Sequence, residues 1–174
     1  MKIRRAVPLL LLLALLPLAS CGYGLVGRGS NLPPGIKAVY LKPLDNRTPR
    51  SQVEQFLTRA IADELVTRQR FAVASSAAQA NAELSGAVVA FGATPVTFDN
   101  QGRATEYEIS ITAQVLFKRL DNNQVIWKND HYNFRESYPV EVSSANYFDQ
   151  ENLALEKASK HFAQTMVSDL LEGF

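Results

Sequence analysis

Few side chains in this sequence could act as nucleophiles or bases, and their spacing matches no catalytic pattern. The two histidines, His131 and His161, fall on different expected elements, and neither stands in a zinc-binding spacing such as HExxH. The sequence contains no GxSxG elbow and no SxxK pair, the arrangements that activate a serine. Glu106 and Glu108 fall side by side on the polar face of an expected strand, as on any solvated sheet. We therefore predict a protein that is not an enzyme, with no catalytic residue, no metal site and no cofactor.

The only thiol, Cys21, predicts a different chemistry, because it follows a leader-like segment. Residues 1–20 contain no acid, have three basic residues among the first five and continue into the apolar run Leu9–Leu16. This pattern is typical of a secretory signal peptide. Its apolar run is too short to form a permanent transmembrane helix, which needs about 20 apolar residues. Leu18-Ala19-Ser20-Cys21 resembles the lipobox of bacterial lipoproteins, in which the thiol receives a diacylglycerol, the chain is cut before the cysteine and the new amine is acylated. The resemblance implies cleavage between Ser20 and Cys21 and lipid attachment at Cys21.

Several acyl chains on one residue would hold the protein stably at a membrane, whereas one chain holds only marginally. Gly22 follows the cysteine, and by resemblance to lipoprotein sorting in bacteria with two membranes this implies the outer membrane. Residues 21–35 contain five of the nine glycines and are predicted to be a tether. Because fifteen residues reach at most about 50 Å, the following domain stays close to the membrane. The expected topology is anchored, not spanning.

The chain of 174 residues leaves 154 after the leader, with 15 basic and 17 acidic side chains. That length is sufficient for one hydrophobic core without a metal or a disulfide. A slightly negative chain without a basic stripe argues against a nucleic-acid partner. We predict a single domain over residues 36–174.

Two helices are indicated by apolar residues at helical spacing. The first follows Ser51-Gln52-Val53-Glu54, which is typical of a capping box, although Thr48 as N-cap before Pro49 is a competing start. Its apolar stripe consists of Val53, Phe56, Leu57, Ala60, Ile61 and Leu65. The second spans 148–171, with Gly173 at the expected C-cap. Its stripe consists of Leu155, Ala158, Phe162, Met166 and Leu170.

Strands are indicated at 36–41 and in three long segments over 83–138, with a short strand or turn at 71–74. Residues 105–120 alternate most clearly, with apolar side chains on one face. The phase of 124–138 changes, which predicts a bulge near Asn129–Asp130. Turn residues at 99–102 and 121–123 make the three segments an antiparallel meander, and the first strand returns through a helix to pair in parallel. The predicted fold is α+β: a two-layer sandwich with two helices on one face of a mixed four-stranded sheet, in the order β-α-β-β-β-α.

With these elements in place, the chain resembles the LptE family of lipopolysaccharide-assembly lipoproteins. The resemblance is carried by the lipobox followed by Gly-Tyr, by the element order and by the turn-and-strand segment Asp99-Asn-Gln-Gly-Arg-Ala-Thr-Glu-Tyr-Glu108. Within this segment Gly102 forms the turn, and Glu106 and Tyr107 open the alternating strand. Val125-Ile126-Trp127 and the last amphipathic helix add to it.

The resemblance implies a non-enzymatic role in the cell outer membrane. Family members plug the lumen of a large outer-membrane β-barrel, LptD, assist its assembly and take part in delivering lipopolysaccharide to the cell surface. Some members contact lipopolysaccharide through a basic residue in the turn before Glu-Tyr. Here Asp99 cannot pair with a lipid phosphate, so Arg103 in the same turn is the candidate contact. The alternative is an adaptor lipoprotein of another envelope secretion or transport complex, because a ring-forming subunit would suit the same element order.

Overall fold

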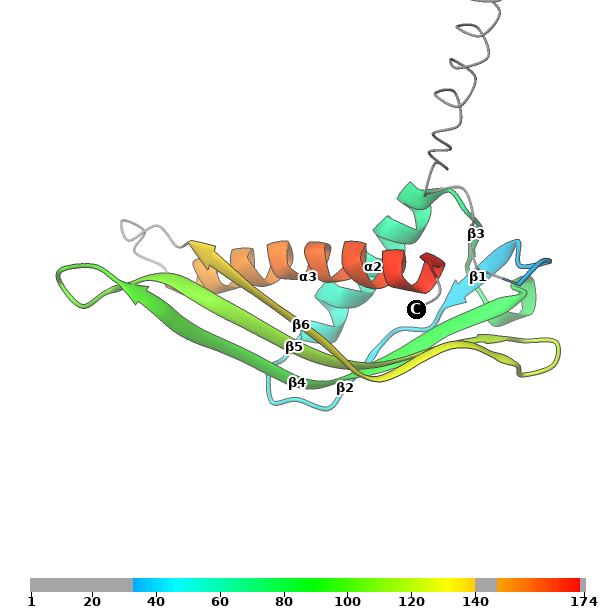
Figure 1. The fold of residues 1–174 in the computed structure, drawn as a ribbon, viewed down its shortest axis with the longest axis horizontal. Helices are drawn as coiled ribbons and strands as arrows, with labels where there is room; N and C mark the ends of the chain where they lie inside the picture. The colour runs from blue at the N-terminus through cyan, green and yellow to red at the C-terminus, as the bar shows by residue number, and fades with distance from the viewer. Residues whose placement is uncertain (1–32, 140–146, 173–174) are drawn as a thin grey trace, which may run out of the picture.

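The computed structural model describes residues 33–139 and 147–172 (Figure 1). The predicted signal peptide, Cys21 and most of the predicted tether lie outside these residues. The strands are β1 (Ala38–Leu41), β2 (Asp45–Asn46), β3 (Ala72–Ala74), β4 (Ala82–Phe98), β5 (Ala104–Arg119) and β6 (Val125–Pro139). The helices are α2 (Val53–Arg68), the short 3₁₀ helix η3 (Ala77–Gln79) and α3 (Tyr147–Glu172).

The strands form one mixed sheet in the order β3-β1-β4-β5-β6, with β2 also paired to β4. β1 runs parallel to both β3 and β4, as the return through α2 predicts, and β4, β5 and β6 form the expected antiparallel meander. The predicted count of four strands is wrong, because the sheet has six. β2 and β3 contain only two and three residues, too few for a periodic signal, and both exist through pairing with distant strands.

The alternation predicted for β5 is confirmed. Ile109, Ile111, Ala113, Val115 and Phe117 are all buried, and the residues between them are only partly buried. The bulge predicted in β6 is also present, because Ala113 pairs with Tyr132 and Val115 with Asn129, which leaves two β6 residues opposite Gln114. This change of phase keeps Trp127 before the bulge and Tyr132 and Tyr138 after it buried on the core side.

Both helices cover the same face of the sheet (Figure 1), and the core fills the space between the layers. Both predicted stripes point inward. In α2, four of the six stripe residues are buried and the other two are partly buried; in α3, all five are buried. The largest fully buried side chains include Leu57, Ile61, Phe117, Phe162 and Met166. The two-layer α+β architecture therefore follows from the apolar patterns, since each element hides its one apolar face against the others.

The predicted start of α2 is wrong in its chemistry. Gln52 occupies the N-cap position with a left-handed backbone (φ 67°), and its side chain makes no capping hydrogen bond. The Glu54 carboxylate, expected to close a capping box, instead accepts a hydrogen bond from the side-chain amide of Asn46 at 2.8 Å. Asn46 Oδ1 in turn accepts from the Thr48 hydroxyl at 2.8 Å. The polar residues before α2 thus fix the loop onto the helix, and the competing Thr48 cap is not formed either. The C-cap expected at Gly173 lies outside the described residues.

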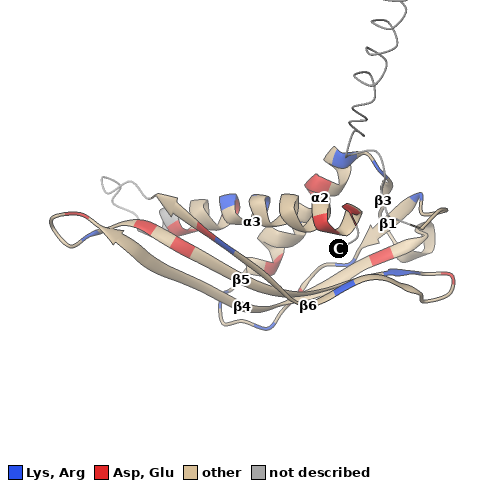
Figure 2. Ribbon diagram, in the orientation of Figure 1, with Lys and Arg blue, Asp and Glu red and all other residues tan. Residues whose placement is uncertain are grey.

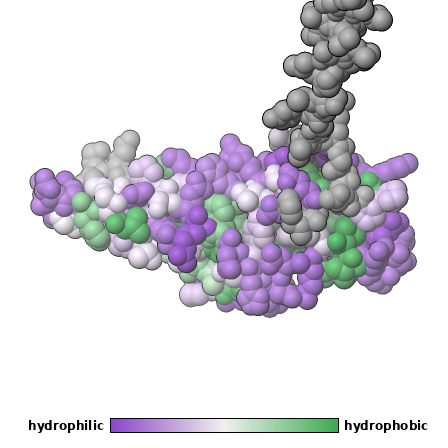
Figure 3. Space-filling model, in the orientation of Figure 1, coloured by the Kyte–Doolittle hydropathy of each residue, from purple (hydrophilic) through white to green (hydrophobic). Residues whose placement is uncertain are grey.

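Charges of both signs are mixed along the elements that Figure 2 shows, without a continuous basic or acidic face in that view. Hydrophilic residues cover most of the surface visible in Figure 3, and one of the apolar areas lies near the end that carries the β4–β5 turn. Val96 and Phe98, near that turn, are 46% and 56% exposed. The β4–β5 hairpin extends from one end of the sheet and exposes these two apolar side chains (Figure 1).

Candidate functional site

The β4–β5 turn, which carries the predicted lipid contact, is tied together by one carboxylate. Asp99 Oδ1 accepts hydrogen bonds from the backbone N–H groups of Gln101 and Arg103 at 2.8 and 2.9 Å. Gly102 has φ +76°, and its N–H donates to the Asp99 carbonyl at 3.0 Å. A left-handed residue is needed where the chain reverses here, and glycine adopts it without steric cost. The conformation of the turn at the tip of the hairpin is therefore fixed by hydrogen bonds within the turn itself.

Arg103 is already paired within this turn. Its Nε lies 2.8 Å from Asp99 Oδ2, and its side chain remains 55% exposed. The backbone and side-chain hydrogen bonds from Arg103 hold the pKa of Asp99 below its usual value, so the carboxylate stays ionised at neutral pH. A phosphate approaching Arg103 would therefore share the guanidinium with Asp99. The terminal guanidinium nitrogens of Arg103 have no hydrogen-bond partner among the described residues, which leaves part of the fork to face an incoming anion.

Glu106 and Tyr107 lie at the base of the hairpin, just inside β5. Glu106 accepts a hydrogen bond from the Thr97 hydroxyl at 2.8 Å, across from it on β4. Tyr107 is half-buried and pairs in register with Pro95 and Tyr138. The Glu-Tyr pair thus fixes the base of the hairpin on both of its faces, one polar and one turned to the core side.

The polar face of β5 continues toward the middle of the sheet as a line of cross-strand contacts. Thr112 donates to Asn133 Oδ1 at 2.9 Å, and Gln114 Oε1 accepts from Arg47 at 3.0 Å. Glu108 lies 3.6 Å from Arg135 Nε. These groups stay in contact with solvent and leave further hydrogen-bonding capacity, so this face can meet another polar surface.

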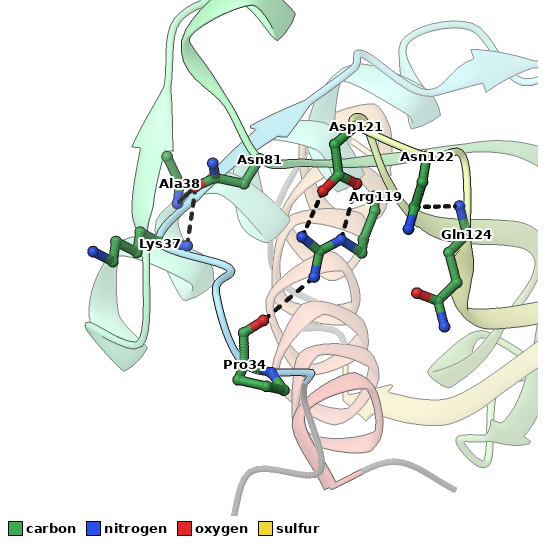
Figure 4. Close-up of polar contacts among 8 residues, drawn as sticks. All are labelled: Pro34, Lys37, Ala38, Asn81, Arg119, Asp121, Asn122 and Gln124. Atoms are coloured by element: carbon green, nitrogen blue, oxygen red, sulfur yellow. Dashed lines mark hydrogen bonds and ion pairs between the residues drawn. The ribbon is translucent and has the colours of Figure 1, made fainter.

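At the opposite end of β5 the chain holds the segment that precedes β1 (Figure 4). Arg119 donates to both carboxylate oxygens of Asp121, at 2.9 and 2.6 Å, and to the Pro34 carbonyl at 3.3 Å. The hydrogen bonds to Asp121 raise the pKa of Arg119 and lower that of Asp121. Nearby, Asn81 Oδ1 accepts from the N–H groups of Lys37 and Ala38 at 3.2 Å each. The beginning of the described chain is therefore fastened to the β5–β6 turn.

The two histidines lie on different elements, His131 on β6 and His161 on α3. His161 on α3 places Nδ1 2.8 and 2.9 Å from the two carboxylate oxygens of Glu136 on β6. His131 is exposed beside the β6 bulge. Within residues 33–139 and 147–172, no three His, Cys, Asp or Glu side chains gather as metal ligands, and neither helix has the length and apolarity to cross a membrane.

Ser20 and Cys21 lie outside the described residues, so processing and acylation stay predictions. The structure brings together Gly102, Arg103 and Asp99 in one turn, with Glu106 and Tyr107 just beyond it. All five lie in the turn before β5 or at the start of that strand, at the opposite end from Arg119.

The sequence alone does not predict two of the polar contacts in these regions. Asp99 is the acceptor that holds Arg103, and Arg119 is the donor that holds the Pro34 carbonyl. The spacing of four residues across a tight turn is the available signal for the first contact. Nothing local signals the second, because Pro34 and Arg119 are 85 positions apart.

A comparison with models of known protein families identifies the family of this chain. The family model LptE, lipopolysaccharide-assembly, matches residues 36–170. The chain belongs to the LptE family. The match begins just before the first strand and extends almost to the end of α3, so it covers nearly all of the fold described above. Comparison with curated proteins finds none that matches.

Solved structures agree on the fold. A hypothetical protein from Chlamydia trachomatis has a TM-score of 0.53 at 11% identity and covers 79% of this chain and 96% of its own. A protein from Xanthomonas campestris has a TM-score of 0.53 at 13% identity, covering 82% and 91%. A candidate lipoprotein from Caulobacter crescentus has a TM-score of 0.51 at 14% identity, covering 76% and 87%. At these identities the likeness concerns the arrangement of helices and strands alone.

Proposed function

We propose that this LptE-family chain is a lipoprotein of the outer membrane that sits in the lumen of an LptD-type β-barrel. It supports assembly of that barrel and takes part in delivering lipopolysaccharide to the outer leaflet. The observation that carries the proposal is the polar sheet face, formed by hydrogen-bonding side chains over a closed core. The lumen of a large outer-membrane barrel is polar, so a plug needs this kind of exterior.

The proposed anchor is Cys21, processed after Ser20 and acylated. The experiment is to purify the tagged, full-length protein from outer membranes in detergent and to identify and count its partners by native mass spectrometry. One copy for each barrel supports the proposal, and depletion should then remove lipopolysaccharide from the cell surface. A stable monomer without a barrel, or a homo-oligomeric ring, contradicts it, and a ring favours the adaptor function instead.

Acylation has its own test. Cys21→Ala removes the thiol that the lipid would occupy, so the variant should accumulate as an uncleaved or soluble form. Ser51→Ala, at an exposed position before α2, is the control and should stay with the membrane. A Cys21→Ala protein that is correctly processed and still sediments with membranes contradicts the lipid anchor.

Direct lipid contact is proposed at Arg103. Replacing it with glutamate puts two carboxylates in the turn, which repel the phosphates of lipopolysaccharide. Arg103→Glu should weaken lipopolysaccharide binding in vitro and leave barrel association nearly intact. Arg59→Glu on α2, also exposed, controls for the change of charge. Unchanged lipopolysaccharide binding would make Arg103 an ordinary solvated residue of the turn.

A further inference from the structure

The polar face of the sheet contains a hollow of about 270 Å³ where β2, β4, β5 and β6 meet. We call it the β2 hollow, and its charged and amide lining consists of Lys42, Asp45, Arg47, Gln114, Lys128 and Asp130. Figure 2 shows basic residues on the loop after β2 and on β6, the elements that border it. It lies well away from the β4–β5 turn, since Gln114 is eleven positions along β5 from Arg103.

The hollow is a consequence of three local features of the backbone. Pro43 interrupts the strand that begins with β1, so β2 joins β4 only at Ala87 and Val88. Gly86 allows a close approach of β4 and β5 beneath the hollow, because a Cβ there would lie 2.2 Å from the Gln114 carbonyl oxygen. The β6 bulge displaces Asp130 from the regular ladder opposite Gln114. These features are built into the backbone, so the hollow exists before any ligand arrives.

Positive charge in the hollow is only partly neutralised. Lys128 is paired with Asp130 at 2.8 Å. Arg47 uses one guanidinium nitrogen to reach the Gln114 amide oxygen at 3.0 Å, which orients it without neutralising it. Among the described residues, no carboxylate lies within ion-pair distance of Arg47 or of the Lys42 ammonium. Three cations against two carboxylates leave a net charge of about +1 in the hollow, with Arg47 and Lys42 available to bind.

We infer that the β2 hollow receives a single carboxylate side chain, an Asp or Glu projecting from the wall of the enclosing barrel, held by Arg47 and Lys42. This inference rests on the proposed function and names one contact within it. A carboxylate matches the remaining charge of +1 and accepts hydrogen bonds from the arginine fork. A phosphate monoester carries about −1.5 to −2, more than the hollow can neutralise, and Asp45 and Asp130 repel it more strongly than a singly charged carboxylate. The proposed occupant is therefore one carboxylate of the barrel wall and not a second lipid phosphate.

The test measures association of the purified full-length protein with the purified barrel in detergent, at low and high salt. Lys42→Glu and Arg47→Glu should each weaken association about tenfold or more at low salt, because a charge-assisted contact becomes a repulsion. High salt should reduce this difference by screening the charges. Gln114→Leu, which removes the group that orients Arg47, should cause a smaller loss of affinity. Lys157→Glu on α3 is the matched control and should change affinity little.

A crosslinking experiment identifies the acid directly. A photo-reactive residue at position 42 should crosslink to a barrel segment that contains an Asp or Glu. Replacing that acid with Arg should then restore binding to Arg47→Glu, because the charges of the pair are exchanged. A crosslinked segment without an acid would overturn the inference.

The outcomes separate the two proposals. If the wild-type protein binds the barrel and the Lys42→Glu and Arg47→Glu variants bind equally well, the proposed carboxylate contact in the β2 hollow is wrong. The proposed plug function is then unaffected. Wild-type protein that does not bind the barrel overturns both. Loss of lipopolysaccharide binding in these variants with full barrel binding also overturns the inference, since the hollow would then hold phosphate. The thermal unfolding temperature of each variant shows whether the fold is kept, as expected for exposed substitutions.

Discussion

Phe162 packs α3 against the sheet through ring contacts with two side chains of β6. It is fully buried, and its ring meets Tyr132 edge-on at a centroid distance of 5.4 Å and Phe134 at 5.9 Å. Phe162→Ala deletes the ring and leaves a cavity between the layers. Such a change costs about 3–5 kcal/mol. Phe162→Leu keeps most of the apolar volume and loses mainly the two ring–ring contacts, at about 0.5–1.5 kcal/mol each.

For a domain of this size, each kcal/mol corresponds to about 4 °C in the unfolding temperature. Phe162→Ala should therefore unfold about 12–20 °C below wild type, and Phe162→Leu about 4–12 °C below it. Differential scanning calorimetry of the mature protein measures both shifts. Leu153→Ala is the control, because Leu153 on the same helix is 50% exposed and should shift the midpoint by less than about 2 °C. A Phe162→Ala midpoint within about 4 °C of wild type would refute this packing of α3.

Three further predictions concern individual side chains. Tyr132→Phe keeps the ring and removes the hydroxyl that donates to Asp169 at 2.7 Å. Chemical denaturation should show a loss of about 1–3 kcal/mol in the free energy of unfolding, because a charged acceptor loses its donor. In the same assay Gly102→Ala should lose about 1–2 kcal/mol through its left-handed backbone alone, since nothing lies within 4 Å of the added Cβ. Asp99 has a lowered pKa in the folded protein, so its contribution is complete above its unfolded pKa and is lost as pH falls through the lower folded value. Stability measured from about pH 5 down to about pH 2 should therefore fall less steeply for Asp99→Asn than for wild type, and an identical slope would contradict this.

The long elements of this fold follow from periodicity, and the short ones do not. β5 and α3 each bury one stripe, so the spacing of Ile109, Ile111 and Phe162 predicts their faces without any tertiary information. β2 contains two residues, and it is a strand only because β4 offers it free backbone groups beyond the end of β1. No local pattern can signal the pairing of Asp45 with Ala87, because the partner lies far away in the sequence.

The side-chain contacts of the candidate sites depend even more on tertiary placement. Glu54 has the spacing of a capping box, yet its carboxylate binds Asn46 instead, because the loop folds back onto the helix. The sequence identifies Arg103 as the basic residue of the turn, but it does not show that the Asp99 carboxylate holds its guanidinium. Sequence shows which charges are close along the chain; it does not show which of them is already neutralised.

The positions of the fastened N-terminal segment and of the hairpin tip constrain any assembly built on this fold. Arg119, which holds Pro34, and Arg103, beside the tip, stand at opposite ends of β5, and its sixteen residues span about 50 Å as antiparallel strand. In the proposed assembly thirteen residues, Cys21 to Pro33, connect the anchor to Pro34, and a chain of that length reaches at most about 45 Å. That reach is shorter than the strand. Because Pro34 is held at the Arg119 end of β5, the β4–β5 turn lies one strand length from the point where the tether enters the domain. In the proposed assembly the candidate lipid contact at Arg103 is therefore at the end of the plug opposite the tether.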